Sequence, residues 1–116
     1  MTHSIWEYQQ STGHRPGVDL TGFEVEAIDG KVGKVDKHSE EFGASFLVVD
    51  AGPWILGKRV LLPAGVISSI DHENSIVFVA RTKEEIKDAP ELEKEINIED
   101  DEYHRQLASY YGAPHT

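Results

Sequence analysis

Apolar and polar residues alternate near the start of the first structured segment as they do in half-buried β-strands. Phe23, Val25 and Ala27 alternate with Glu24 and Glu26. Because successive side chains of a strand point to opposite faces, this pattern predicts one apolar face and one solvated face. We therefore expect a strand here, with the two glutamates on its solvated side.

Asp29 and Gly30 predict a tight turn directly after this strand. An Asp-Gly pair between two strand-like segments favours a two-residue type I′ turn, because both turn positions need a positive φ. Val32 and Val35 then begin the returning strand, and Gly33 between them predicts a bulge or a tight bend. The first two strands should therefore form a hairpin.

Further strand-like segments follow, with connections too short to hold crossover helices. Residues 45–50 are apolar in their centre and predict a strand buried on both faces, and shorter strands are predicted over 60–62, 66–70 and 76–80. Since parallel neighbours need long crossovers, we expect antiparallel, meander-like pairing of about six strands. The edge strands of a sheet expose unpaired N–H and C=O groups, and a short sheet can protect them by curling. The sequence therefore predicts a small, partly open antiparallel β-barrel.

The apolar spacing becomes helical after residue 81. Thr82 and Glu85 form a capping box that predicts a short helix, ended by Pro90. A second helix is predicted over Glu99–Tyr111, where acidic residues at the start oppose the positive end of the helix dipole. Gly112 is placed as its C-cap. The predicted fold is therefore mainly β, with two short C-terminal helices.

Pattern and charge together divide the 116 residues into three parts. We predict a flexible N-terminal segment over 1–18, a barrel domain over 19–81 and an acidic helical extension over 82–116. Residues 1–81 hold 11 acidic and 7 basic residues, and the extension holds 10 and 4. The extension therefore carries more than half of the net charge of −10.

Composition excludes several classes of protein. The chain has no cysteine, which removes disulfides, thiol nucleophiles and thiolate metal sites. Met1–Gln10 lack the basic region and apolar run of a signal peptide, so we expect a cytoplasmic location. A net charge of −10 disfavours nucleic acid and anionic membrane surfaces as partners. No segment approaches the roughly 20 apolar residues of a membrane-spanning helix.

Motifs for catalysis or metal binding are not visible, so we expect no enzymatic activity, no cofactor and no metal site. The sequence has neither a G-x-S-x-G serine motif nor a glycine-rich phosphate loop. The acids at 99–102 lack the alternating ligand pattern of a calcium loop. No two histidines stand at ligand spacing, and we expect them to be solvated; they are His3, His14, His38, His72, His104 and His115.

Residues 22–35 resemble a PRC-barrel domain, and the resemblance continues through Phe46–Val49, Leu62–Val66 and Ile76–Val79. These positions are turn glycines and core residues. PRC-barrel domains occur in the cytoplasmic part of the photosynthetic reaction centre H subunit and in the ribosome maturation factor. The resemblance covers about residues 20–81 and implies a mainly-β, partly open barrel that serves as a protein-interaction platform, with no catalytic motif to transfer.

An apolar loop is the first candidate contact surface. Trp54, Ile55 and Leu56 stand between glycines in a strand connection. They either plug one end of the barrel or form an exposed patch that binds a partner or a second copy, since tryptophan is a preferred interface anchor.

One face of the second helix is the other candidate contact surface. Tyr103, Leu107, Tyr110 and Tyr111 recur at helical spacing. They either pack on their own barrel or contact another subunit or partner. A similar choice applies to the N-terminal cluster 5–8, which is either a docking motif or loosely packed.

These observations favour a non-enzymatic interaction module that self-associates as a homodimer, with a protein or a second copy of itself as partner. Two alternatives remain open. A ribosome- or RNA-linked assembly factor would use Lys31, Lys34 and Lys37, which lie close together in the second predicted strand. A small-ligand-binding barrel would use the barrel interior, which side chains usually fill in a barrel of this size.

Overall fold

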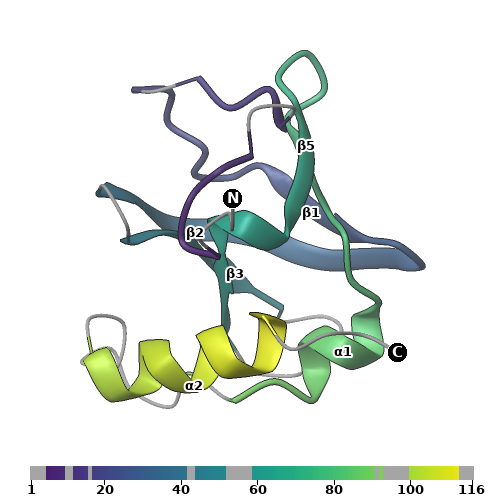
Figure 1. The fold of residues 1–116 in the computed structure, drawn as a ribbon. Helices are drawn as coiled ribbons and strands as arrows, with labels where there is room; N and C mark the ends of the chain where they lie inside the picture. The colour runs from purple at the N-terminus through teal and green to yellow at the C-terminus, as the bar shows by residue number, and fades with distance from the viewer. Residues whose placement is uncertain are drawn as a thin grey trace.

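The fold is mainly β in the computed structural model, which describes residues 5–9, 12–15, 17–41, 44–51, 59–90, 92 and 100–112 (Figure 1). One mixed sheet contains six strands, and two helices follow it along the chain. The strands are β1 (Glu24–Ala27), β2 (Gly30–Glu41), β3 (Ala44–Asp50), β4 (Arg59–Pro63), β5 (Ile67–Asp71) and β6 (Ile76–Val79). A 3-10 turn, η2 (Ala64–Val66), joins β4 to β5, and the helices are α1 (Lys83–Lys87) and α2 (Asp101–Gly112).

The strand order is β4-β3-β2-β1-β6-β5, and every neighbouring pair is antiparallel except β1 and β6. Val25 of β1 pairs with Val77 of β6 in parallel register. The expectation of a wholly antiparallel sheet is therefore wrong at this pair. Short connections exclude parallel pairing only between consecutive strands, whereas β1 and β6 come from opposite ends of the sheet segment.

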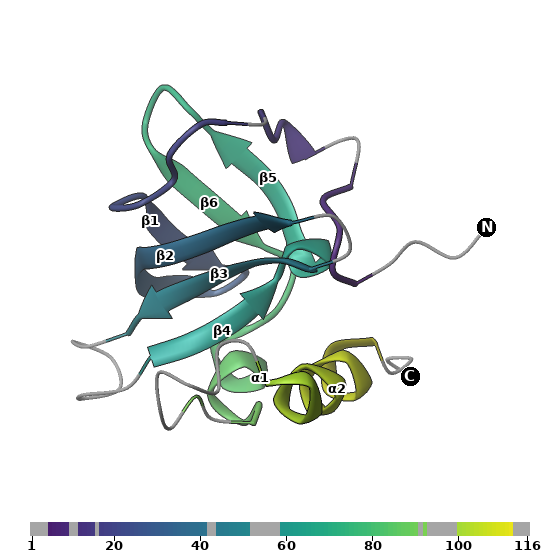
Figure 2. The ribbon, with the colours of Figure 1, turned by 90° about the vertical axis from the view of Figure 1, so that its left-hand side faces the viewer.

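The sheet is curled, because its two edge strands are consecutive in the chain. Only the three residues of η2 separate β4 from β5. Six flat strands would place the two edges roughly 24 Å apart, whereas a three-residue connection spans at most about 14 Å. The sheet therefore bends round (Figure 2), and among the described strands β4 does not pair with β5, so that the sheet is not closed.

A single apolar core joins the strands to both helices. Val25 and Ala27 of β1 are buried, while Glu24 and Glu26 are half-exposed, which confirms the predicted alternation. The residues 45–49 of β3 are all buried, as predicted for a strand covered on both faces. The helices lie beside the β3 and β4 part of the sheet and cover it there (Figures 1 and 2).

The turn between β1 and β2 lies one residue earlier than predicted. Ala27 pairs with Gly30, so the two-residue loop is Ile28-Asp29. Ser75 is the sole non-glycine residue with a positive φ in the described part of the chain, which excludes a type I′ turn at Asp29. Gly30 itself has a φ of +147°, a conformation that L side chains rarely adopt.

Gly33 stands next to a bulge, as predicted. Val25 pairs with Gly33 and Glu26 pairs with Lys31, so the register shifts by one residue between them. A Cβ atom on residue 33 would also overlap the carbonyl group of Asp50 in β3. Close approach of two backbones is therefore a second reason for glycine at this position.

The first helix begins at the predicted capping box. The Glu85 N–H donates to Thr82 Oγ1 at 3.2 Å, and the Thr82 N–H donates to Glu85 Oε1 at 3.2 Å. The Lys83 N–H donates to Asp29 Oδ1 at 2.8 Å. The β1–β2 turn thus supplies an acceptor to the first turn of α1, which contributes to fixing the helix on the sheet.

The second helix starts two residues later than predicted, at Asp101. Asp100 Oδ1 accepts a hydrogen bond of 3.0 Å from the Glu102 N–H, as a capping residue does. Gly112 is the last helical residue that the structure describes. Neither α1 nor α2 has the length and apolar character needed to cross a membrane.

Candidate interaction site

The predicted contact residues Trp54, Ile55 and Leu56 lie outside the described residues. The structure describes the chain up to Ala51 and again from Arg59. The role predicted for this loop therefore stays a prediction from sequence.

The predicted face of α2 packs against the rest of the same chain. Tyr103, Leu107 and Tyr111 are 5%, 0% and 2% exposed, and Tyr110 is half-buried against the same core. This arrangement corresponds to the first of the two interpretations of the face, in which it packs on its own sheet. Contact with another subunit through these residues stays a prediction. Of the four side chains, that of Tyr110 is the most exposed to solvent.

The three tyrosine hydroxyls of α2 have different surroundings. Tyr110 Oη donates to the Glu85 carbonyl oxygen at 2.6 Å, and Tyr103 Oη donates to the Pro90 carbonyl oxygen at 3.1 Å. These bonds tie α2 to the backbone in and just after α1. The Tyr111 hydroxyl is buried and has no hydrogen-bond partner among the described residues. Among the described residues, α2 is therefore held by the hydroxyl groups of Tyr103 and Tyr110, while Tyr111 contributes its buried ring.

Arg81 joins the end of α2 to the start of α1. Its Nη2 donates to the Tyr111 carbonyl oxygen at 2.9 Å, and its guanidinium carbon lies 5.9 Å from the centre of the Tyr111 ring. A cation at the C-terminal end of α2 opposes the negative end of the helix dipole. Burial is the main cause that raises the pKa of Tyr110 and of Tyr111. The nearby carboxylates of Asp88 and Glu85 raise the pKa of Tyr110 further.

An N-terminal arm, meaning residues 5–9 and 12–15, lies across the ends of β3 and η2 and continues toward the β5–β6 turn (Figure 2). The Gly65 N–H donates to the Ile5 carbonyl oxygen at 2.7 Å, and the Ser45 N–H donates to the Trp6 carbonyl oxygen at 2.9 Å. Gln9 Nε2 donates to the Gly65 carbonyl oxygen at 3.0 Å. Two of these three bonds join main chain to main chain, so these two bonds do not use a side chain of the arm.

Gly65 allows the arm to approach the sheet closely. A Cβ atom at this position would lie 2.7 Å from the Ile5 carbonyl oxygen and 2.8 Å from Ile5 Cα. Any other residue would push the arm away. The local sequence of η2 is therefore matched to a second backbone lying against it.

Aromatic side chains add to the main-chain contacts of the arm. The Trp6 ring meets the Phe46 ring edge-to-face at 6.4 Å and lies 4.8 Å from the His104 ring at a tilt of 31°. Tyr8 and His14 stack within the arm, with ring centres 3.8 Å apart and planes 6° apart. Trp6 therefore contacts both β3 and α2, two elements that lie far apart in the sequence.

Every histidine in the described ranges contacts residues 5–20 of the same chain. His72 Nε2 donates to the Gly13 carbonyl oxygen at 2.8 Å, and His38 Nε2 lies 3.3 Å from Asp19 Oδ1. His14 and His104 contribute the ring contacts described above. All four are half-buried, so the expectation of solvated histidines is wrong for them. His3 and His115 lie outside the described residues.

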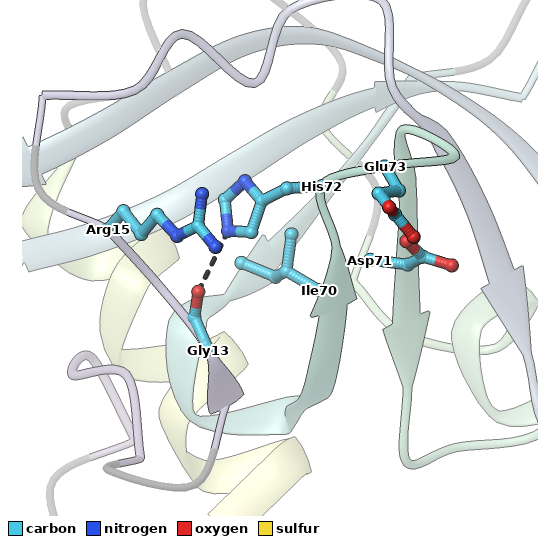
Figure 3. Close-up of a pocket in the computed structure, with 6 residues that line it drawn as sticks. All are labelled: Gly13, Arg15, Ile70, Asp71, His72 and Glu73. Carbon is cyan, nitrogen blue, oxygen red and sulfur yellow. Dashed lines mark hydrogen bonds between the residues drawn. The ribbon is translucent and has the colours of Figure 1, made fainter.

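An open depression lies where the arm meets the β5–β6 turn (Figure 3). In this view, Asp71 and Glu73 lie on one side, and Arg15 and His72 lie on the other with Gly13. Asp71 accepts hydrogen bonds of 2.8 Å and 3.1 Å from Asn74, and these bonds are the main cause that lowers its pKa. Asp71 thus closes the turn and His72 holds the arm, so these two side chains serve the fold.

Lys31 and Lys34, two of the three lysines that an RNA-binding function would use, lie beside acidic residues. Lys31 Nζ lies 3.9 Å from Glu24 Oε2. Lys34 is in register with Glu24 on one side and with Asp50 on the other. The strip is therefore of mixed sign, which is unfavourable for a polyphosphate backbone. No group of three or more His, Asp or Glu side chains within the described ranges could hold a metal ion.

Sequence patterns did not indicate the surface that holds the arm, which we call the arm-binding surface and which consists of Ser45, Phe46, Gly65, His72 and His104. Its members come from β3, η2, the β5–β6 turn and α2, so no single segment carries the pattern. Gly65 was the one local signal, and it also fits a turn glycine.

Comparison of this chain with models of known protein families and with curated proteins found no match.

Proposed function

We propose that this protein is a PRC-barrel-like interaction module that self-associates and acts without catalysis, in the cytoplasm. The observation that carries the proposal is how the interior is filled. Leu20, Leu47, Leu62 and Leu107 are all 0% exposed, although they come from a loop, two strands and a helix. A core packed by its own side chains leaves recognition to the outer surface. A chain without cysteine accords with a reducing compartment.

Contact through the Trp54 loop is the part of this proposal that sequence supports best. Tryptophan is enriched among the residues that dominate interfaces, and Trp54 stands in an apolar segment between two glycines. The face of α2 is a weaker candidate, because three of its four predicted residues already pack on their own chain.

Sedimentation of the purified chain at micromolar concentrations tests the proposal. We expect a concentration-dependent dimer whose dissociation constant rises on Trp54→Ala. Ile28→Ala is the matched control, because Ile28 is a large apolar residue that is 69% exposed at the β1–β2 turn. A chain that stays monomeric at all concentrations, or that responds equally to both substitutions, would contradict the proposal.

A further inference from the structure

The arm-binding surface recognises a segment of chain by its backbone. The Gly65 and Ser45 N–H groups donate to arm carbonyls, and the Gly65 carbonyl oxygen accepts from Gln9. Phe46 and His104 supply an aromatic contact for the Trp6 side chain. This combination of main-chain hydrogen bonds and one aromatic anchor is a common way of binding an extended peptide.

Nearly all contacts between arm and body lie before a single hinge. Ile5, Trp6, Gln9 and Gly13 make these contacts. The Val18 N–H closes a turn by donating to the Arg15 carbonyl oxygen at 3.2 Å. Gly17, inside that turn, has a φ of +84°, and a Cβ atom there would meet nothing within 4 Å. Beyond the turn, Asp19 and Leu20 contact His38 and belong to the body. Rotation about Gly17 and Val18 would therefore free the arm and leave the body intact.

We propose that the arm also binds the arm-binding surface of a second copy of this chain, so that two copies exchange arms. The arm of the second copy has the same backbone, the same Trp6 and the same charge, so it fits the surface as well as the native arm does. A fully extended chain from position 5 to position 15 would reach up to about 35 Å, which is comparable to the 38 × 33 × 31 Å extents of the molecule. The exchange breaks the turn at residues 15–18 and reforms every other arm contact.

The glycine conformation of the hinge determines how easily exchange occurs. In the closed turn, residue 17 must keep a positive φ, which disfavours any side chain. An open hinge has no such requirement. Gly17→Ala should therefore favour exchange by about tenfold for each hinge. Because both hinges of an exchanged dimer are open, the dissociation constant of the dimer should fall by about a hundredfold.

A complementation experiment on the full chain tests this inference, which rests on the self-association proposed above. Trp6→Ala leaves the arm-binding surface intact but removes the anchor of the arm, whereas Gly65→Ala leaves the arm intact but blocks the surface. Each variant alone should be monomeric at concentrations where the unchanged chain is a dimer. Mixed together, the two should form a species of twice the 12.9 kDa mass of one chain, because one arm can then bind one free surface.

The outcomes separate this inference from the proposed function. If each variant alone dimerises as strongly as the unchanged chain, arm exchange is overturned and self-association stands. If the unchanged chain and its Gly17→Ala variant are both monomeric at every concentration, both proposals are overturned. If Gly65→Ala does not fold, Gly17→Ala decides alone: an unchanged or raised dissociation constant overturns exchange, and a lowered one supports it.

Discussion

A Cβ atom on residue 65 would lie 2.7 Å from the carbonyl oxygen of Ile5, so only glycine lets these two backbones meet. We predict that Gly65→Ala displaces the arm while the sheet stays folded, at a cost on the order of 1–3 kcal/mol in the free energy of unfolding. Amide hydrogen exchange should show faster exchange at Ser45, whose N–H donates to the Trp6 carbonyl oxygen.

Gly112→Ala is the control for this substitution, because a Cβ atom there would meet nothing within 4 Å. Its exchange rate at Ser45 should equal that of the unchanged chain. An equally slow rate in the Gly65→Ala variant would show that the arm does not depend on this close approach.

Removal of a hydroxyl from two adjacent tyrosines should have opposite consequences. Tyr110→Phe removes a hydrogen bond of 2.6 Å to the Glu85 carbonyl oxygen and should cost about 1 kcal/mol. Tyr111→Phe removes a buried hydroxyl without a partner among the described residues, and it should be neutral or stabilising. Urea denaturation of both variants checks this difference. Equal losses would mean that the Tyr111 hydroxyl contributes a bond of its own.

Alkaline pH should destabilise the protein through Tyr111. Burial raises the pKa of its phenol above the ordinary value of 10.0. The unfolded chain therefore loses this proton at a lower pH than the folded chain does. The free energy of unfolding should fall as the pH rises above about 10, and it should not depend on this group below that pH. Tyr111→Phe should flatten the fall in the urea midpoint between about pH 9 and 11, and an identical fall in both chains would contradict the assignment.

The start of α1 should depend on a carboxylate from the β1–β2 turn. Asp29→Ala removes the acceptor of the Lys83 N–H, which bonds Asp29 Oδ1 at 2.8 Å, and should cost about 0.5–2 kcal/mol. Asp29→Asn keeps an oxygen acceptor at the same place and should retain most of the stability. Thermal denaturation of the two variants gives the comparison. If both lose the same amount, charge rather than the hydrogen bond links the turn to the helix.

The local elements could be predicted from the sequence because short-range patterns determine them. The alternation at Val25 and Ala27 and the capping box of Thr82 and Glu85 each involve residues a few positions apart, and both are confirmed. The β1–β2 turn was misplaced by one residue, because an Asp-Gly pair fits both a type I′ turn and a loop that ends before glycine.

Long-range relationships could not be predicted in the same way. No pattern near β1 indicates that its second neighbour is β6, because parallel pairing depends on how the sheet curls. The arm-binding surface likewise depends on β3, η2 and α2 meeting around Trp6. Half-buried histidines such as His72 have the same sequence spacing as solvated ones, so their contacts appear only in three dimensions.

The pairing of β1 with β6 has a consequence for the order in which the chain folds. Glu24 pairs with Ile76, so this contact closes a loop of about 50 residues. Closing so long a loop costs conformational entropy, and we expect it to occur only after the intervening strands have formed. During synthesis, the strand edge of β1 stays open until β6 has left the ribosome. We expect folding to be limited by this late closure, and the exposed edge of β1 to be the site where premature contacts between nascent chains begin.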